Sequence, residues 1–259
     1  MLYYFGATLA FIFSIFSKEN AVTFLVIIPA ALYFFTNTSI KKIGLATLPF
    51  LAIVAIFWFG IRAPILGEAA SIAGGENAPS TELMNDPFLK IENNRYVPFT
   101  SEERFSTVMY TWLEYMQLLV YPHPLTNDYY PKHIRTNLDL IPTFEMGRVM
   151  FSILLHLILG ILMVLGTLKK KPYAFFILFY LATFSVVSNL VFSIGSNMAE
   201  RFMFLPSVGF SALCAMGLYE LINRSRKSKG IVKAMKVPTF ILALVCLLYS
   251  VKTYARNFA

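Results

Sequence analysis

The residues best suited to chemistry lie at the ends of long apolar runs, where a charged side chain is costly unless it is used or paired. The first group, residues 17–20, contains Lys18 and Glu19. It is either a hairpin turn whose charges reach the membrane interface or the edge of a polar cavity. In a cavity, Glu19 would be a catalytic or sugar-binding carboxylate, and Lys18 would meet an anion. Adjacent residues do not share a helix face, so the two would serve different partners.

The second group lies at residues 199–207, where Glu200 and Arg201 come just before an apolar run that contains Pro206. One interpretation is an ion pair at the start of a helix. The other is a phosphate site, in which Arg201 binds the anion together with backbone N–H groups and the dipole of a helix N-terminus. Glu200 would then lie beside the bound substrate.

The third group is the Pro- and Tyr-rich segment 122–131, which contains Asp128 and Tyr129. Asp128 is a candidate general base, metal ligand or turn cap, and the local sequence favours the cap. Tyr129 is a candidate substrate contact. The three histidines show no spacing typical of a metal site, so a divalent metal stays an open question and its ligands are unknown.

A helical pattern precedes this segment. Over residues 106–121 the apolar positions recur at helical spacing, with Glu114 in the middle. A helix with such a polar centre fits a membrane interface or a re-entrant position better than a free span. Trp112, Glu114 and Tyr115 would then cover the site, and Trp112 and Glu114 would contact the substrate.

The composition is that of a membrane protein, with 57% hydrophobic and 14% charged residues, whereas soluble domains carry about 25% charged residues. The net charge of +8 does not indicate a nucleic-acid partner, because the excess base lies in short loops between apolar runs. Seven runs are candidates to span a bilayer: 2–16, 21–35, 44–61, 147–168, 172–194, 202–222 and 237–251.

Charge predicts how these spans are oriented. Eleven Lys and Arg lie in three loops, 41–42, 169–171 and 224–236, and Glu220 is the one acid on their side. The three loops share a side only if 106–121 does not cross, and dense positive charge marks the cytoplasmic side. We therefore expect an all-α integral membrane protein of about seven transmembrane helices. Its parts would be membrane helices in 1–61, an outer loop over 62–146, and membrane helices in 147–259 that end outside.

At these residues the chain resembles a known family. The stretch SNLVFSIGSNMAERFMFLPSVGF (188–210) is similar to a segment of the membrane O-mannosyltransferases that carry tetratricopeptide repeats. SKEN (17–20) is similar to their SKE segment, and NDPF with the later PLTNDY resembles their outer loop. Those enzymes are C-type (GT-C) glycosyltransferases, which use polyprenyl-phosphate-linked sugars. The resemblance covers nearly the whole chain in the same order.

The resemblance implies a glycosyltransferase, or a fragment of one. Such an enzyme moves a sugar from a polyprenyl phosphate in the outer leaflet to a Ser or Thr hydroxyl of a protein. The reaction needs a base for the hydroxyl and a cation for the leaving phosphate. Arg201 is the first candidate for the phosphate and Lys18 the second, while Glu19 and Asp128 are candidates for sugar, acceptor or acid roles.

Two family features do not appear in the sequence. These are the acidic residue or Asp pair of the first outer loop and the repeat domain after the last span, so we expect the isolated chain to be inactive. The expected partners are a lipid membrane, a polyprenyl-phosphate-linked sugar and a protein acceptor, with no nucleic acid. We expect the bacterial inner membrane rather than the endoplasmic reticulum.

Two other function classes fit a chain of this kind. A transporter or flippase of lipid-linked sugars predicts charged residues deep within several spans, whereas the charges here lie at span ends and in outer loops. A non-catalytic pseudoenzyme or membrane anchor fits if the base is missing. Both remain alternatives.

Overall fold

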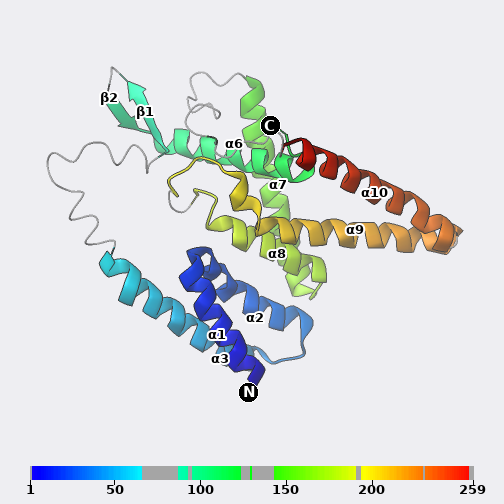
Figure 1. Cartoon of the computed structure of the whole chain (residues 1–259), viewed down its shortest axis with the longest axis horizontal. Coiled ribbons are helices and arrows are strands. Elements are labelled where there is room, and N and C mark those ends of the chain that lie inside the picture. The colour runs from blue at the N-terminus through cyan, green and yellow to red at the C-terminus, as the bar shows by residue number, and fades with distance from the viewer. Residues whose placement is uncertain are drawn as a thin grey trace. The chain divides into compact units, whose positions relative to one another are not determined.

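The computed structural model describes residues 2–65, 87–92, 95–123, 129, 143–190, 194–229 and 231–256, which are mostly helical (Figure 1). The chain forms two compact units, Met1–Phe210 and Ser211–Ala259. The helices are α1 (Leu2–Ser17), α2 (Phe24–Phe35), α3 (Ile40–Ala55), α6 (Ser101–Val120), α7 (Thr143–Leu168), α8 (Pro172–Ser185), α9 (Pro206–Lys229) and α10 (Ile231–Arg256). Shorter elements are the turns η1 (Glu19–Thr23), η2 (Ile56–Arg62) and η4 (Glu200–Met203) and the strands β1 (Leu89–Glu92) and β2 (Arg95–Pro98).

The first three helices of the larger unit pack together, and α1 and α2 run in opposite directions (Figure 1). Phe11 of α1 meets Phe50 of α3 edge to face, with ring centroids 5.1 Å apart. Ile15 and Ala21 complete this buried cluster. The reversal between α1 and α2 occurs at Lys18, whose backbone is extended (φ −157°). Lys18 and the residues after it therefore form the turn of a helical hairpin.

Three of the described helices are long and apolar enough to cross a membrane: Ile40–Ile65, Met146–Leu168 and Pro238–Ala255. Three shorter apolar helices, Leu2–Ser17, Asn20–Phe35 and Pro172–Ser185, match other expected runs. The total of seven crossings stays a prediction. Among the described residues the expected run 172–194 is helical only as far as Ser185, and beyond it the Asn189 side chain bonds to the Ile194 N–H and the Ser196 carbonyl.

Helix α6 begins five residues earlier than the predicted start at residue 106, because Thr100 caps it. The Thr100 side chain accepts a hydrogen bond from the Glu103 N–H at 3.2 Å, and the Glu103 carboxylate accepts one from the Thr100 N–H at 2.8 Å. This reciprocal pair is a capping box. The strands β1 and β2, which the sequence analysis did not predict, pair antiparallel just before it. The Lys90 ammonium of β1 donates to Glu103 at 2.6 Å and fastens the hairpin to α6.

The Glu103 interactions make a prediction about pH. The hydrogen bond from Lys90, then that from Thr100, lowers the pKa of the Glu103 carboxyl below its usual 4.5. A lowered pKa in the folded state stabilises the fold above about pH 4.5, and this contribution is lost as the pH falls through the lowered value. We expect Glu103→Gln to lower the free energy of unfolding by about 1–3 kcal/mol at neutral pH. The difference from wild type should shrink below pH 4.5.

Thermal unfolding in detergent between acidic and neutral pH measures this difference. Glu102→Gln is the matched control, because Glu102 lies in the same helical turn but is exposed. Equal pH profiles for the two variants would contradict the prediction.

Helix α9 approaches α8 closely at Gly209. A Cβ atom at Gly209 would lie 2.8 Å from the Phe176 carbonyl oxygen and 2.9 Å from the Tyr180 nitrogen. Since both atoms belong to the backbone, neither can move aside cheaply. We expect Gly209→Ala to lower the free energy of unfolding by about 1–3 kcal/mol, measured by thermal unfolding in detergent.

The control for this change lies in the same helix. A Cβ at Gly217 would meet nothing within 4 Å. Gly217→Ala should therefore raise stability by up to about 1 kcal/mol through helix propensity alone. If Gly209→Ala and Gly217→Ala change the free energy of unfolding in the same direction, packing at Gly209 does not decide the outcome.

The smaller unit contains the rest of α9 together with α10. In α9 the Arg224 guanidinium pairs with Glu220 at 3.0 Å, one helical turn away, and both side chains are mostly exposed. The apolar residues of α10 that the structure describes are also exposed. An exposed ion pair such as Arg224–Glu220 contributes little to stability.

Candidate functional site

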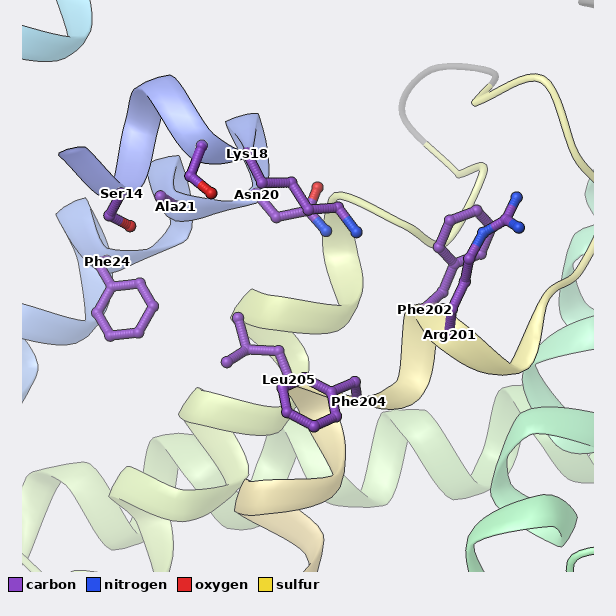
Figure 2. A pocket seen from close by; sticks show the side chains of 10 residues that line it. Ser14, Lys18, Asn20, Ala21, Phe24, Arg201, Phe202, Phe204 and Leu205 are labelled. Carbon is purple, nitrogen blue, oxygen red and sulfur yellow. The ribbon is translucent and has the colours of Figure 1, made fainter. Parts of the chain in front are cut away.

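The two charged groups that the sequence analysis singled out meet in one cleft. Ten residues line a cavity of about 260 Å³ in the larger unit: Ser14, Ser17, Lys18, Asn20, Ala21, Phe24, Arg201, Phe202, Phe204 and Leu205. The first six come from α1, η1 and the start of α2, and the other four from η4 and the residues just after it. Figure 2 shows the two groups facing each other. The cleft thus has a cation on each side and an apolar floor.

Lys18 reaches this cleft from the position just after α1, where its N–H donates to the Ser14 carbonyl at 3.0 Å. Ser14 and Ser17 of α1 add two hydroxyls to the lining. The Lys18 side chain is exposed, and among the residues that the structure describes its ammonium makes no hydrogen bond or ion pair. Lys18 is therefore available to an incoming anion.

Arg201 lies in η4, and its guanidinium carbon is 5.3 Å from the centre of the Phe202 ring. The Phe202 and Phe204 N–H groups already donate to the Ala199 and Arg201 carbonyls, and α9 begins only at Pro206. Help from other backbone N–H groups stays a prediction, and the cations that line the cleft are the side chains of Arg201 and Lys18.

The loop that leads to η4 is organised by one buried residue, Asn189. Its side-chain amide donates to the Ser196 carbonyl at 2.7 Å and the Asn197 carbonyl at 3.3 Å, and its Oδ1 accepts from the Ile194 N–H at 2.9 Å. Asn189 has φ 59°, a left-handed conformation that asparagine tolerates better than most residues. The side chain of Asn189 therefore joins the two ends of the loop that leads to Glu200 and Arg201.

One face of α6 holds the same loop at three points. Arg104 donates to the Asn189 carbonyl at 3.4 Å, and the Trp112 indole donates to the Ser188 carbonyl at 3.1 Å. The buried Tyr115 hydroxyl accepts from the Ala199 N–H at 2.9 Å. Positions 104, 112 and 115 repeat at helical spacing, so they share a face. α6 therefore supports the residue immediately before Glu200.

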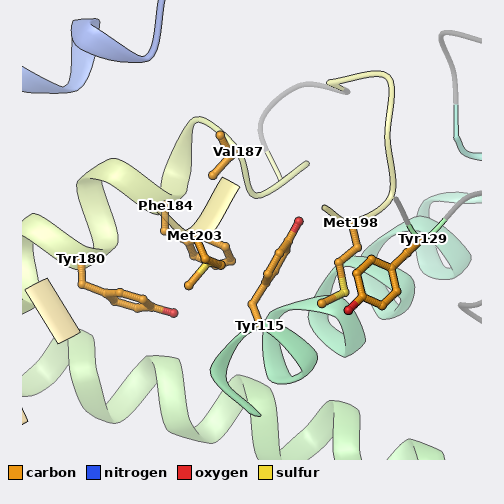
Figure 3. Packing of buried hydrophobic residues seen from close by; sticks show 7 residues of the cluster. All are labelled: Tyr115, Tyr129, Tyr180, Phe184, Val187, Met198 and Met203. Carbon is orange, nitrogen blue, oxygen red and sulfur yellow. The ribbon is translucent and has the colours of Figure 1, made fainter. Parts of the chain in front are cut away.

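An aromatic core surrounds this support (Figure 3). It is built from Tyr115, Tyr129, Tyr180, Phe184, Val187, Met198 and Met203. The rings of Tyr115 and Phe184 meet edge to face, with centroids 5.4 Å apart. Close packing of side chains from α6, α8 and the loop leaves the loop few alternative positions.

Tyr129 and Glu200, both predicted substrate contacts, lie together. The Tyr129 hydroxyl donates to Glu200 Oε1 at 3.3 Å, and the Tyr129 N–H donates to the Met198 carbonyl at 3.4 Å. The Tyr129 side chain is buried, and Glu200 is half-buried. These contacts fix the carboxylate next to Arg201.

Like Tyr129 and Glu200, the predicted contacts Trp112 and Glu114 are not among the residues that line the cleft. The Trp112 ring packs against His156, with centroids 4.6 Å apart. The Glu114 carboxylate is bonded to the Arg148 guanidinium, which also contacts Gln117 and donates to the Tyr110 hydroxyl at 2.8 Å. These contacts join α6 to α7 and to the loop. In this structure the side chains of Trp112 and Glu114 thus connect neighbouring elements.

The two predicted catalytic carboxylates are not described in the structure. Asp128 lies outside the described residues, and of Glu19 only the backbone, at the start of η1, is described. No group of three or more His, Cys, Asp or Glu side chains that could hold a metal occurs in the described ranges. The roles of Glu19 and Asp128 stay predictions.

Several residues of the site were missed by the sequence analysis. Ser17 and Asn20 were named only as part of the turn 17–20, and Ser14 was not singled out. Tyr115 was expected to cover the site but not to hold the loop, and Asn189 was quoted only within a longer stretch. Nothing local in the sequence marks their hydrogen bonds, because the partners lie far away or depend on the loop.

Comparison with known proteins finds curated relatives of this chain. No family model and no solved structure matches the chain. A protein O-mannosyl-transferase of Caenorhabditis elegans is 29% identical over 187 residues, which are 72% of this chain and 24% of that protein. This chain is similar to protein O-mannosyl-transferases. TMTC4 of Homo sapiens is 38% identical over 72 residues, 28% of this chain and 10% of that protein.

A third relative extends the same result. The protein O-mannosyl-transferase Tmtc1 of Drosophila melanogaster is 35% identical over 82 residues, 30% of this chain and 9% of that protein. The chain thus spans about a quarter or less of the length of these curated relatives. All three come from animals, so the expected preference for a bacterial inner membrane finds no support in them. The apolar helices agree with an integral membrane protein.

Proposed function

We propose that this chain is the donor-binding part of a glycosyltransferase that moves mannose from a polyprenyl phosphate to a protein hydroxyl. The observation that carries the proposal is the cleft that Lys18 and Arg201, which are far apart in the sequence, both line. The printed names of the relatives support the reaction class. The wider expectation of a GT-C enzyme with about seven membrane helices is part of this proposal.

The lining of the cleft suits an amphiphilic phosphate ester. Two cations can neutralise a phosphate, and charge-assisted hydrogen bonds from a guanidinium are the strongest of their kind. Phe24, Phe204 and Leu205 supply apolar surface for the first part of a lipid chain. Phe204 is 80% exposed, so its ring has surface left to bury.

The reaction breaks the bond between the sugar C1 and the phosphate oxygen and forms a bond between C1 and the acceptor oxygen. The acceptor hydroxyl gives its proton to a base, and the phosphate leaves with the bonding electron pair. Arg201 and Lys18 would stabilise the charge that develops on that phosphate. Glu19 and Asp128 are the carboxylates proposed for acid, base or sugar contacts. Tyr129 would hold Glu200 in place beside Arg201.

The test is transfer of radiolabelled mannose to a Ser/Thr peptide by membranes that contain the product of the whole open reading frame. We expect transfer from polyprenyl-phosphate mannose, none from a nucleotide-linked mannose, and none to a peptide in which Ala replaces Ser and Thr. Transfer from the nucleotide-linked sugar would overturn the donor assignment. A folded protein that binds polyprenyl phosphate but transfers nothing would point to the transporter or pseudoenzyme alternatives.

A further inference from the structure

Five exposed lysines gather at the end of the larger unit that lies away from the cleft. Lys41 and Lys42 lie in the first turn of α3, and Lys169, Lys170 and Lys171 form the turn between α7 and α8. We call these five residues the lysine patch. The loop residues around them, 36–42 and 167–173, contain no Asp or Glu. Nothing in these loops offsets the five positive charges.

Tertiary contacts hold the two loops of the patch side by side. The Tyr33 hydroxyl, near the end of α2, donates to the Thr167 carbonyl at 3.3 Å. The Lys170 ammonium lies 4.7 Å from the centre of the Tyr33 ring. The rings of Phe35 and Phe175 meet with centroids 4.9 Å apart. The end of α2, which leads into the loop before Lys41, therefore lies against the turn that carries Lys169, Lys170 and Lys171.

The turn keeps a lysine where the backbone favours glycine. Lys170 has φ 48°, in the left-handed region. The turn is closed by the Lys171 N–H, which donates to the Gly166 carbonyl at 2.9 Å, and by the Lys170 N–H, which donates to the Thr167 carbonyl at 3.1 Å. A glycine would fit this turn without strain, but it would remove the ammonium that lies over Tyr33.

The patch lies at the level where the apolar helices end. The candidate span Ile40–Ile65 begins beside Lys41, and the span Met146–Leu168 ends just before Lys169. Aromatic rings at this level, such as Tyr33, are typical of a membrane–water interface. Helices α2 and α7 end at this level and helices α3 and α8 begin here, so their dipoles oppose each other. The electrostatic field at the patch is therefore set by the lysines.

We propose that the lysine patch binds the phosphate headgroups of anionic phospholipids in the adjacent leaflet. Clusters of four to eight basic side chains at a membrane surface favour such lipids. The loops that Tyr33 joins would place ammonium groups around one headgroup, while the neighbouring spans lie along its acyl chains. This proposal does not depend on the glycosyltransferase assignment, because the patch and the cleft lie at opposite ends of α2.

The test is native mass spectrometry of the full chain in mild detergent with equimolar phosphatidylserine and phosphatidylcholine. We expect wild type to retain phosphatidylserine in at least about tenfold preference. A variant with the five patch lysines changed to Gln should lose most of this preference. The matched control changes five other bases to Gln: Arg226, Lys227, Lys229, Lys233 and Lys236.

Each outcome decides the proposal. Loss in the patch variant, with retention both in the control and in a variant that carries Arg at the five patch positions, supports it. Equal loss in the patch and control variants would mean that only net charge matters, and no loss in either would remove the patch; both overturn it. Displacement of the lipid by millimolar inorganic phosphate would overturn it too, since the site would then be one for free anions.

Discussion

Replacing Arg201 with alanine is expected to weaken the binding of a polyprenyl phosphate to the chain about 10- to 100-fold. A hydrogen bond between charged groups contributes about 1.5–3 kcal/mol, and each 1.4 kcal/mol is a tenfold change in affinity. Arg201 is exposed at the cleft, so solvent can fill its place and the fold should survive the change. Titration of a fluorescent polyprenyl phosphate into the detergent-solubilised chain measures the effect.

The uncharged polyprenol is the control ligand, because it has the same chain without the phosphate. Wild type should prefer the phosphate, and Arg201→Ala should lose most of that preference while its affinity for the alcohol is unchanged. Arg201→Lys keeps the charge but not the planar fork, so it should retain part of the preference. Arg224→Ala removes a mostly exposed guanidinium from the smaller unit and should bind like wild type. Equal loss of both ligands in Arg201→Ala would show that Arg201 supports the cleft instead of binding phosphate.

The sequence singled out Lys18 and Arg201 as candidates but did not predict that they line one cleft. Lys18 and Arg201 were singled out because charges at the ends of apolar runs are costly. Their meeting in one cleft could not be read from the sequence, because it depends on how α1 and η1 pack relative to η4. The sequence analysis named Arg201 and Lys18 as first and second candidates for one phosphate, but it gave no geometry that joins them.

The boundaries of the elements show where local patterns fail. The apolar run 172–194 predicts one long helix, yet α8 ends at Ser185, because the side chain of Asn189 offers its neighbours better hydrogen bonds within a loop. Tertiary hydrogen bonding here overrides helix propensity. The opposite failure occurred near α6, where readable signals were missed. Thr100 and Glu103 have capping-box spacing, and the sequence LKIENNRYVP alternates around a turn, as hairpins do.

Trp112 and Glu114 illustrate a limit of reasoning from residue type. A Trp and a Glu on an interfacial helix suit a binding site as well as a packing interface. The structure gives Trp112 a hydrogen bond to the Ser188 carbonyl and gives Glu114 the Arg148 guanidinium. Both partners lie on segments distant in the sequence, so no local pattern could have named them.

Asn189→Ala is expected to lower the free energy of unfolding by about 2–5 kcal/mol. The change leaves the Ser196 and Asn197 carbonyls and the Ile194 N–H without their Asn189 partner in a buried loop, and each unsatisfied buried group costs about 1–3 kcal/mol. It also places an alanine in a left-handed conformation, which asparagine tolerates better. The melting temperature in detergent should fall by roughly 5–15 °C.

The same variant tests whether the loop positions the site. If Asn189 orders the chain up to η4, Asn189→Ala should also reduce the preference for polyprenyl phosphate over polyprenol at temperatures where the protein is still folded. Asn189→Asp keeps the acceptor for the Ile194 N–H but sets a carboxylate against two carbonyl oxygens, so it should be at least as damaging. The exposed Asn37→Ala should behave like wild type. A destabilised Asn189→Ala protein that keeps its full phosphate preference would separate the stability of the loop from the geometry of Arg201, and would mean that the cleft holds Arg201 by its own contacts.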